Sequence, residues 1–171
     1  MENFKNFLKS LFIFLTFCFT NQVLGKTESI GSVKSWKAFV SVIDKNKTCF
    51  LASVPEKSEG EYKRDNRGKT YVFVTNIKGV SSHEVSVVAG FNYKKNSEVL
   101  FSIDKKETKM FPIEDRAWSE SSKTDRMLVK AMKRGKKLVV SGISSPGNLV
   151  KDTYSLSGFT KALSIIDKSC L

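Results

Sequence analysis

The C-terminal segment carries the pattern that most constrains the fold, because its apolar stripe ends in a cysteine. The apolar residues of this stripe recur every three or four positions: Phe159, Ala162, Leu163, Ile166 and Cys170. This spacing predicts an amphipathic helix over about 157–169, with Ser157 or Ser155 as its N-cap. The helix must bury its apolar face, and with it the terminal cysteine, against a core that the rest of the chain supplies.

The N-terminal segment has the organisation of an export signal. Lys5 and Lys9 precede a short apolar run over 11–19, and Val23-Leu24-Gly25 offers small residues at a cleavage position. The run is too short to span a bilayer, which needs ~20 apolar residues. We therefore predict a signal peptide over 1–25 and a single mature domain over 26–171, exported to the periplasm, with the outer membrane or cell surface as further destinations.

Removal of the leader takes Cys18 away and leaves Cys49 and Cys170. An even cysteine count in an exported chain favours a disulfide. Cys49 lies in KTCFLASV, whose β-branched and aromatic content is typical of a strand, and a helix that covers a sheet can bring the two sulfurs together. Two separate buried thiols are the alternative.

The middle of the chain is rich in strand patterns separated by turn residues. Eight segments alternate or concentrate apolar residues at strand length: 36–43, 47–54, 70–77, 84–91, 98–104, 107–113, 136–144 and 148–156. The charged stretch 55–69 shows no periodicity and is interpreted as a long exposed loop. A second amphipathic helix is expected over about 122–134, starting with the capping sequence Ser122-Lys123-Thr124-Asp125 and ending at Gly135. The expected fold is mainly β: an antiparallel β-sandwich or partly open β-barrel with two amphipathic helices and one disulfide.

The sequence offers no pattern for a catalytic, cofactor or metal site. Gly68-Lys69-Thr70 lacks the earlier glycine and the following helix of a phosphate-binding loop, so Arg67-Gly68 is interpreted as a turn. The single histidine, His83, is interpreted as a surface turn residue, and one histidine with two distant cysteines has no metal-ligand spacing. Trp118 and Tyr154 are expected to anchor the core. We expect a non-enzyme without a cofactor.

The net charge of +12 suggests anionic partners, and the alternative is a solvated surface charge that follows from the composition of the chain. Only five of the 29 basic residues are arginine, the usual choice for specific phosphate recognition, so we expect no specific nucleic acid. The second helix gathers cations on one side, and these form the candidate face for an anionic partner: Lys123, Arg126, Lys130, Lys133, Arg134 and Lys137.

Several segments together resemble the invasion-associated locus B family of Gram-negative bacterial exported proteins. The most specific are the closing TYSLSGF…A…IDK-C signature, the C-F-L-A-S-x-P segment and Arg67-Gly68, and the resemblance covers nearly all of 26–171. It implies that Cys49 and Cys170 are the paired cysteines, that the protein belongs to the envelope or cell surface, and that no catalytic residues carry over.

These observations predict an exported, non-catalytic envelope protein. Its basic face would contact a protein, lipid or polysaccharide of the envelope or host surface, with peripheral membrane contact as one form of this binding. The alternatives are an envelope hydrolase built on a serine or carboxylate site, and a periplasmic chaperone-like factor with an exposed apolar groove.

Overall fold

The computed structural model describes residues 26–43 and 46–171, so the predicted signal peptide lies outside the described residues. These residues form eleven strands, two α-helices and one short 3₁₀ helix. Their bounds are β1 Lys26–Val33, β2 Trp36–Ile43, β3 Asn46–Ser53, β4 Lys57–Gly60, η1 Arg64–Asn66, β5 Tyr71–Ile77, β6 Ser81–Val88, β7 Val99–Ile103, β8 Lys106–Ile113, β9 Arg116–Trp118, α2 Ser122–Arg134, β10 Lys137–Ile143, β11 Leu149–Ser155 and α3 Phe159–Cys170.

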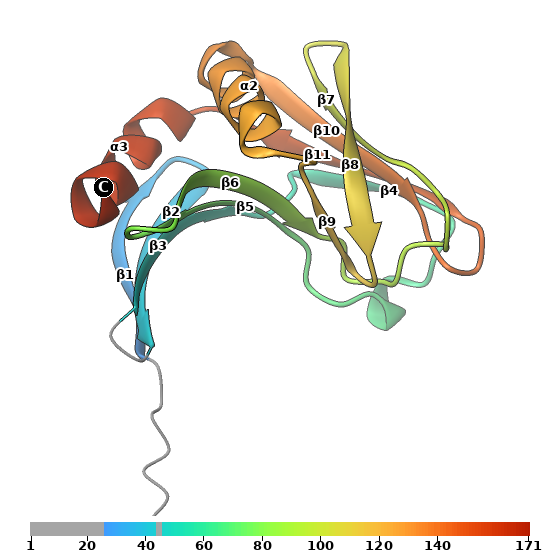
Figure 1. Cartoon of the computed structure of the whole chain (residues 1–171). Coiled ribbons are helices and arrows are strands. Elements are labelled where there is room, and N and C mark those ends of the chain that lie inside the picture. Colours follow the sequence, from blue (N-terminus) through green and yellow to red (C-terminus); the bar gives the residue numbers. More distant parts are fainter. Residues whose placement is uncertain (1–25, 44–45) are drawn as a thin grey trace, which may run out of the picture.

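The strands join in one open antiparallel sheet in the order β1-β2-β3-β5-β6-β9-β8-β7-β10-β11-β4. Figure 1 shows the sheet curving strongly, with the short strand β9 between its two halves and both helices along one side. The two halves also touch directly, since the Trp36 indole nitrogen donates to the carbonyl oxygen of Ser155 at 3.1 Å. The mainly β class and the two helices are confirmed.

Alternating apolar residues explain why these segments form strands with one buried side. In β3, Cys49, Leu51 and Ser53 are buried while their neighbours are partly exposed, and β7 repeats this pattern. All eight expected strand segments are present, within three residues of the expected ends. The prediction missed β1 and β9, and it was wrong to treat 55–69 as loop throughout, because β4 and η1 lie there. β4 is held by pairing with β11, a partner that the local sequence does not reveal.

Helix α2 has the predicted bounds but a different N-cap. Ser121, not Ser122, caps it, because the Ser121 hydroxyl accepts from the Thr124 backbone N–H at 3.3 Å. Asp125 does not complete a capping box. Its carboxylate is buried and accepts from the backbone N–H of Val85 in β6. Val85 lies just before the residues of β6 that pair with β9. Asp125 therefore fastens α2 to the sheet.

Helix α3 buries the whole predicted apolar stripe, including Cys170. Its N-cap is Gly158 rather than Ser157 or Ser155, and Gly158 has a φ of 85°. A Cβ at Gly158 would lie 2.7 Å from the carbonyl oxygen of Val33, so the close approach of the chain to β1 requires glycine there.

The disulfide between Cys49 in β3 and Cys170 in α3 is confirmed, with a Cα–Cα distance of 5.9 Å. It joins residues 121 positions apart and fixes the C-terminal helix on the sheet. At the other end of α3, Phe159 packs edge-on against Trp36 with ring centroids 4.9 Å apart. A covalent bond and an aromatic contact thus hold the two ends of this helix.

Candidate functional site

The candidate face for an anionic partner is fully presented to solvent. All six residues of this basic face are exposed: Lys123, Arg126, Lys130, Lys133, Arg134 and Lys137. The first five lie on α2, at spacings that keep them on one side, and the sixth begins β10. The opposite side of α2 buries Leu128, Val129 and Met132, which fixes the direction in which the cations point.

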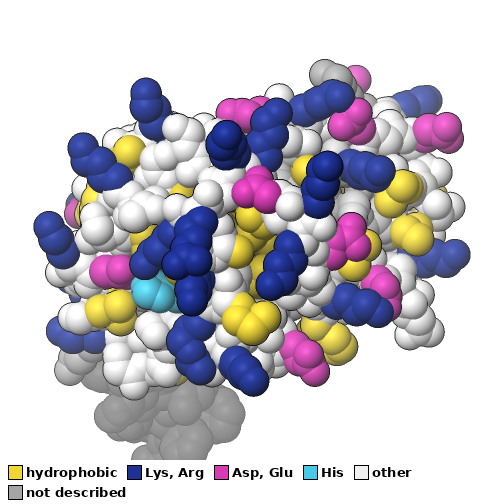
Figure 2. Space-filling view, turned by 90° about the horizontal axis from the view of Figure 1, so that it is seen from above, with side chains coloured by type: hydrophobic (Ala, Val, Ile, Leu, Met, Phe, Trp, Pro, Cys, Tyr) yellow, Lys and Arg dark blue, Asp and Glu magenta, His cyan; other side chains and the backbone are white. Residues whose placement is uncertain are grey.

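None of these six cations forms a salt bridge with any residue in the described part of the chain, although salt bridges occur elsewhere. Figure 2, seen from the side that carries the helices, shows Lys and Arg side chains spread over this surface with fewer Asp and Glu side chains among them. Unpaired surface cations attract anions over about a Debye length, ~8 Å at physiological ionic strength. The basic face can therefore attract anions without first breaking an internal ion pair.

A second group of polar residues lies inside the molecule, around Arg67. Its guanidinium forms a two-pronged bond with Asp152 of β11, with nitrogen–oxygen distances of 2.8 and 2.5 Å. It also donates to the carbonyl oxygen of Ala89 and, at 3.1 Å, to the hydroxyl of Tyr62. The rings of Tyr62 and Phe91 lie 5.2 and 5.1 Å from the guanidinium carbon. The side chains of Arg67 and Asp152 are only 7% and 6% exposed, so this is a buried, fully engaged ion pair.

Local backbone geometry brings Arg67 to this position. Gly68 donates its N–H to the carbonyl oxygen of Gly90, and a Cβ on Gly90 would lie 2.2 Å from the Gly68 oxygen. Gly90 also has a φ of 71°, so both the conformation and the close approach require glycine. From the other side, the Ser58 hydroxyl in β4 donates to Asp152 at 2.6 Å. The prediction of a simple exposed turn at Arg67-Gly68 was wrong.

Electrostatics stabilises the charged form of this pair. Burial acts to lower the pKa of Arg67, but the hydrogen bond and the charge of Asp152 outweigh it, so the pKa of Arg67 is raised. Burial, followed by the Asp152 charge, raises the pKa of the neighbouring Tyr154 hydroxyl, which keeps it neutral. Tyr154 is fully buried and its hydroxyl lies 3.2 Å from that of Thr70, so its predicted role as a core anchor is confirmed.

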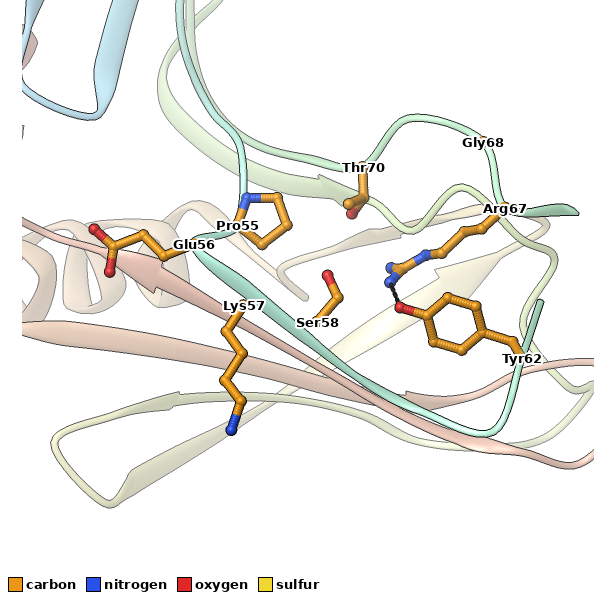
Figure 3. A pocket seen from close by; sticks show the side chains of 8 residues that line it. All are labelled: Pro55, Glu56, Lys57, Ser58, Tyr62, Arg67, Gly68 and Thr70. Atoms are coloured by element: carbon orange, nitrogen blue, oxygen red, sulfur yellow. Dashed lines mark hydrogen bonds between the residues drawn. The ribbon is translucent and has the colours of Figure 1, made fainter. Parts of the chain in front are cut away.

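A cavity of about 460 Å³ opens beside Arg67. Figure 3 shows Tyr62 turned toward Arg67, while Glu56 and Lys57 extend away from it. The polar groups closest to Arg67 already bond one another. The Arg67 guanidinium therefore links β11 and, through Asp152, β4 to the segment before β5. The residues that line the cavity are Pro55, Glu56, Lys57, Ser58, Tyr62, Arg67, Gly68 and Thr70.

His83 is not the isolated turn residue that the sequence suggested. It lies in β6 with a φ of 59°, and its Nε2 is 2.8 Å from the Asp167 carboxylate of α3. Fully buried Asn76 donates to the same carboxylate oxygen and accepts from the His83 backbone N–H. Because Asn76 pairs with Cys49 across β3 and β5, this polar group braces α3 close to the disulfide.

Within 26–43 and 46–171, no cluster of three or more His, Cys, Asp or Glu side chains has a metal-binding arrangement. Among the described helices, none combines the length and the apolar character needed to cross a membrane.

The fold and the surface define a class: a mainly β protein with one disulfide, a buried arginine–aspartate pair and an exposed basic helix face. The family model for the Invasion associated locus B (IalB) protein matches residues 36–167. The chain therefore belongs to this family of envelope-associated proteins, which is not a known enzyme family. Neither curated proteins nor solved structures give a match to the chain.

Proposed function

We propose that this protein is exported to the periplasm, the outer membrane or the cell surface. We further propose that it binds an anionic envelope or host-surface partner there and does not catalyse a reaction. The observation that carries this proposal is the basic face, with six exposed cations that have no acidic partner in the described part of the chain. Family membership supports the envelope association, and the disulfide supports an oxidising compartment.

The contrast with the buried arginine supports binding over catalysis. The cavity beside Arg67 measures about 460 Å³, yet Arg67 is held by Asp152 and by the Ala89 carbonyl. The basic face, in contrast, has its charges free.

The test is a salt series with vesicles of acidic lipid and, separately, with an acidic polysaccharide. Lys123→Glu/Lys130→Glu/Arg134→Glu reverses three charges of the basic face, and binding should weaken by at least tenfold at low salt. Wild-type binding should also fall steeply between about 50 and 500 mM salt, because screening shortens the range of attraction. Binding that is insensitive to salt, or equal in this variant, would refute the proposal.

A matched control separates the basic face from total charge. Lys63, Lys94 and Lys95 are exposed, lie outside α2 and make no salt bridge with any described residue. Lys63→Glu/Lys94→Glu/Lys95→Glu causes the same change in net charge as the α2 variant. Its binding should stay within about threefold of wild type at about 150 mM salt, where distant charges are screened.

A further inference from the structure

A second cavity, of about 430 Å³, lies where β6 meets the start of α2, and we call it the Trp118 pocket. Its lining includes Ser81 and Glu84 of β6, Trp118 of β9, and Arg126 of α2. Arg126 also belongs to the basic face, so this pocket adjoins that surface. The pocket combines one aromatic side chain with hydroxyl, carboxylate and guanidinium groups.

Trp118 departs from its predicted role as a core anchor. Trp36 is fully buried, whereas Trp118 is partly exposed and lines a cavity. It lies in the short strand β9 and pairs with Phe111 on one side and Ser86 on the other, which holds its backbone in place. A partly exposed, well-positioned indole offers an apolar surface on which a flat ligand face can pack.

The charged side chains of the pocket differ in whether they already have hydrogen-bond partners. Asp125 is engaged, since it accepts from Val85 and from the Ser119 hydroxyl at 2.5 Å. Arg126 and Glu84 take part in no salt bridge or side-chain hydrogen bond with the described residues. The pocket thus presents one cation and one strong acceptor to an incoming ligand.

We propose that the Trp118 pocket binds an acidic oligosaccharide. One face of a sugar ring packs on the Trp118 indole, and ring hydroxyls donate to the Glu84 carboxylate. The sugar carboxylate pairs with Arg126, while further acidic units of the chain extend along the basic face. This inference rests on the proposed function and narrows its anionic partner to an acidic glycan.

The test titrates oligogalacturonate, as the acidic probe, and a malto-oligosaccharide of the same length, as the neutral probe, into the disulfide-bonded protein. Calorimetry gives the affinity, and indole fluorescence reports contact at Trp118, because Trp36 is fully buried. Trp118→Ala should weaken acidic binding by about tenfold, the loss expected when a packed aromatic surface is removed. Trp118→Phe keeps an aromatic ring and should stay within about threefold of wild type.

Ser82→Leu tests the same pocket if the Trp118→Ala variant fails to fold. Ser82 is exposed and lines the same pocket, so a larger side chain there narrows the pocket without disturbing the core. This variant should also lose about tenfold in acidic binding, with an unchanged thermal unfolding midpoint.

The outcomes separate this inference from the proposed function. Wild-type affinity for oligogalacturonate in folded Trp118→Ala or Ser82→Leu would overturn the Trp118 pocket as the binding site. If Lys123→Glu/Lys130→Glu/Arg134→Glu loses binding in that case, the basic face still stands as the surface that binds anions. Equal affinity for the neutral probe would also overturn the inference. Wild-type protein that binds acidic vesicles but not oligogalacturonate would overturn the glycan and keep the function. Wild-type protein that binds neither acidic vesicles nor oligogalacturonate would overturn both the inference and the proposed function.

Discussion

The molecule treats its cations in two opposite ways. Arg67 is buried, and Asp152, Ala89 and Tyr62 take up its hydrogen bonds. The cations of the basic face are exposed and have no acidic partner within the described part of the chain. The buried cation joins distant segments of the chain and so serves the architecture, whereas the exposed cations contribute little to folding and remain available to another molecule.

We expect opposite results for the two regions. Changes to the disulfide or to the buried hydrogen-bonded side chains should lower the free energy of unfolding and leave anion binding unchanged in the folded protein. Changes to the basic face should do the reverse.

Removal of the disulfide in Cys49→Ala/Cys170→Ala should have the largest effect. The bond closes a loop between residues 121 positions apart, and its loss should cost about 4–5 kcal/mol of unfolding free energy in the chain-entropy view. Urea unfolding of the variant and of wild type measures the difference. A cost below about 1 kcal/mol would show that α3 is held on the sheet by packing alone.

Asp152→Ala should cost about 3–5 kcal/mol, because it leaves the Arg67 charge buried without its partner. Urea unfolding at neutral pH measures the loss. Arg67→Met/Asp152→Leu is the matched control, since removing both charges together removes the unpaired ion and should recover most of the stability. An Asp152→Ala variant as stable as wild type would mean that the interior does not depend on this pair.

Asn76→Ala should cost about 1–3 kcal/mol, since it leaves the His83 backbone N–H without its acceptor beside a buried site. Ser58→Ala should cost about 1 kcal/mol, because Arg67 still neutralises Asp152 when the Ser58 hydroxyl is gone. Thermal unfolding of the two variants tests the order. A larger loss for Ser58→Ala than for Asn76→Ala would contradict this order.

Lys123→Glu/Lys130→Glu/Arg134→Glu should change the unfolding free energy by no more than about 0.5 kcal/mol per position, since exposed, unpaired charges contribute little. The same urea experiment measures this value. A loss of several kcal/mol would mean that these cations stabilise the fold, and the contrast with Arg67 would disappear.

The sequence predicts best those features that periodicity and cysteine count encode. The apolar stripe that ends in Cys170 predicted α3, and its disulfide with Cys49 followed from an even cysteine count and the family resemblance. The exposed side of α2 was predicted for the same reason, because a 3.6-residue period separates its two faces.

The sequence predicts least where two distant polar residues meet. Arg67 and Asp152 lie 85 positions apart, and neither local segment indicates a partner. The signal available was indirect: Arg67 is one of five arginines in a lysine-rich chain and stands in a segment that carries the family resemblance. The contact of His83 with Asp167 was missed for the same reason, at a separation of 84.

The strictest test of the basic face as the binding surface is the dissociation constant for acidic vesicles across a salt series, determined side by side for three proteins. These are wild type, the interior variant Ser58→Ala, and the surface variant Lys123→Glu/Lys130→Glu/Arg134→Glu. We expect wild type and Ser58→Ala to bind alike with the same steep salt dependence, while the surface variant loses at least tenfold in affinity and most of that dependence. Equal binding by all three proteins would contradict the assignment of the basic face as the binding surface.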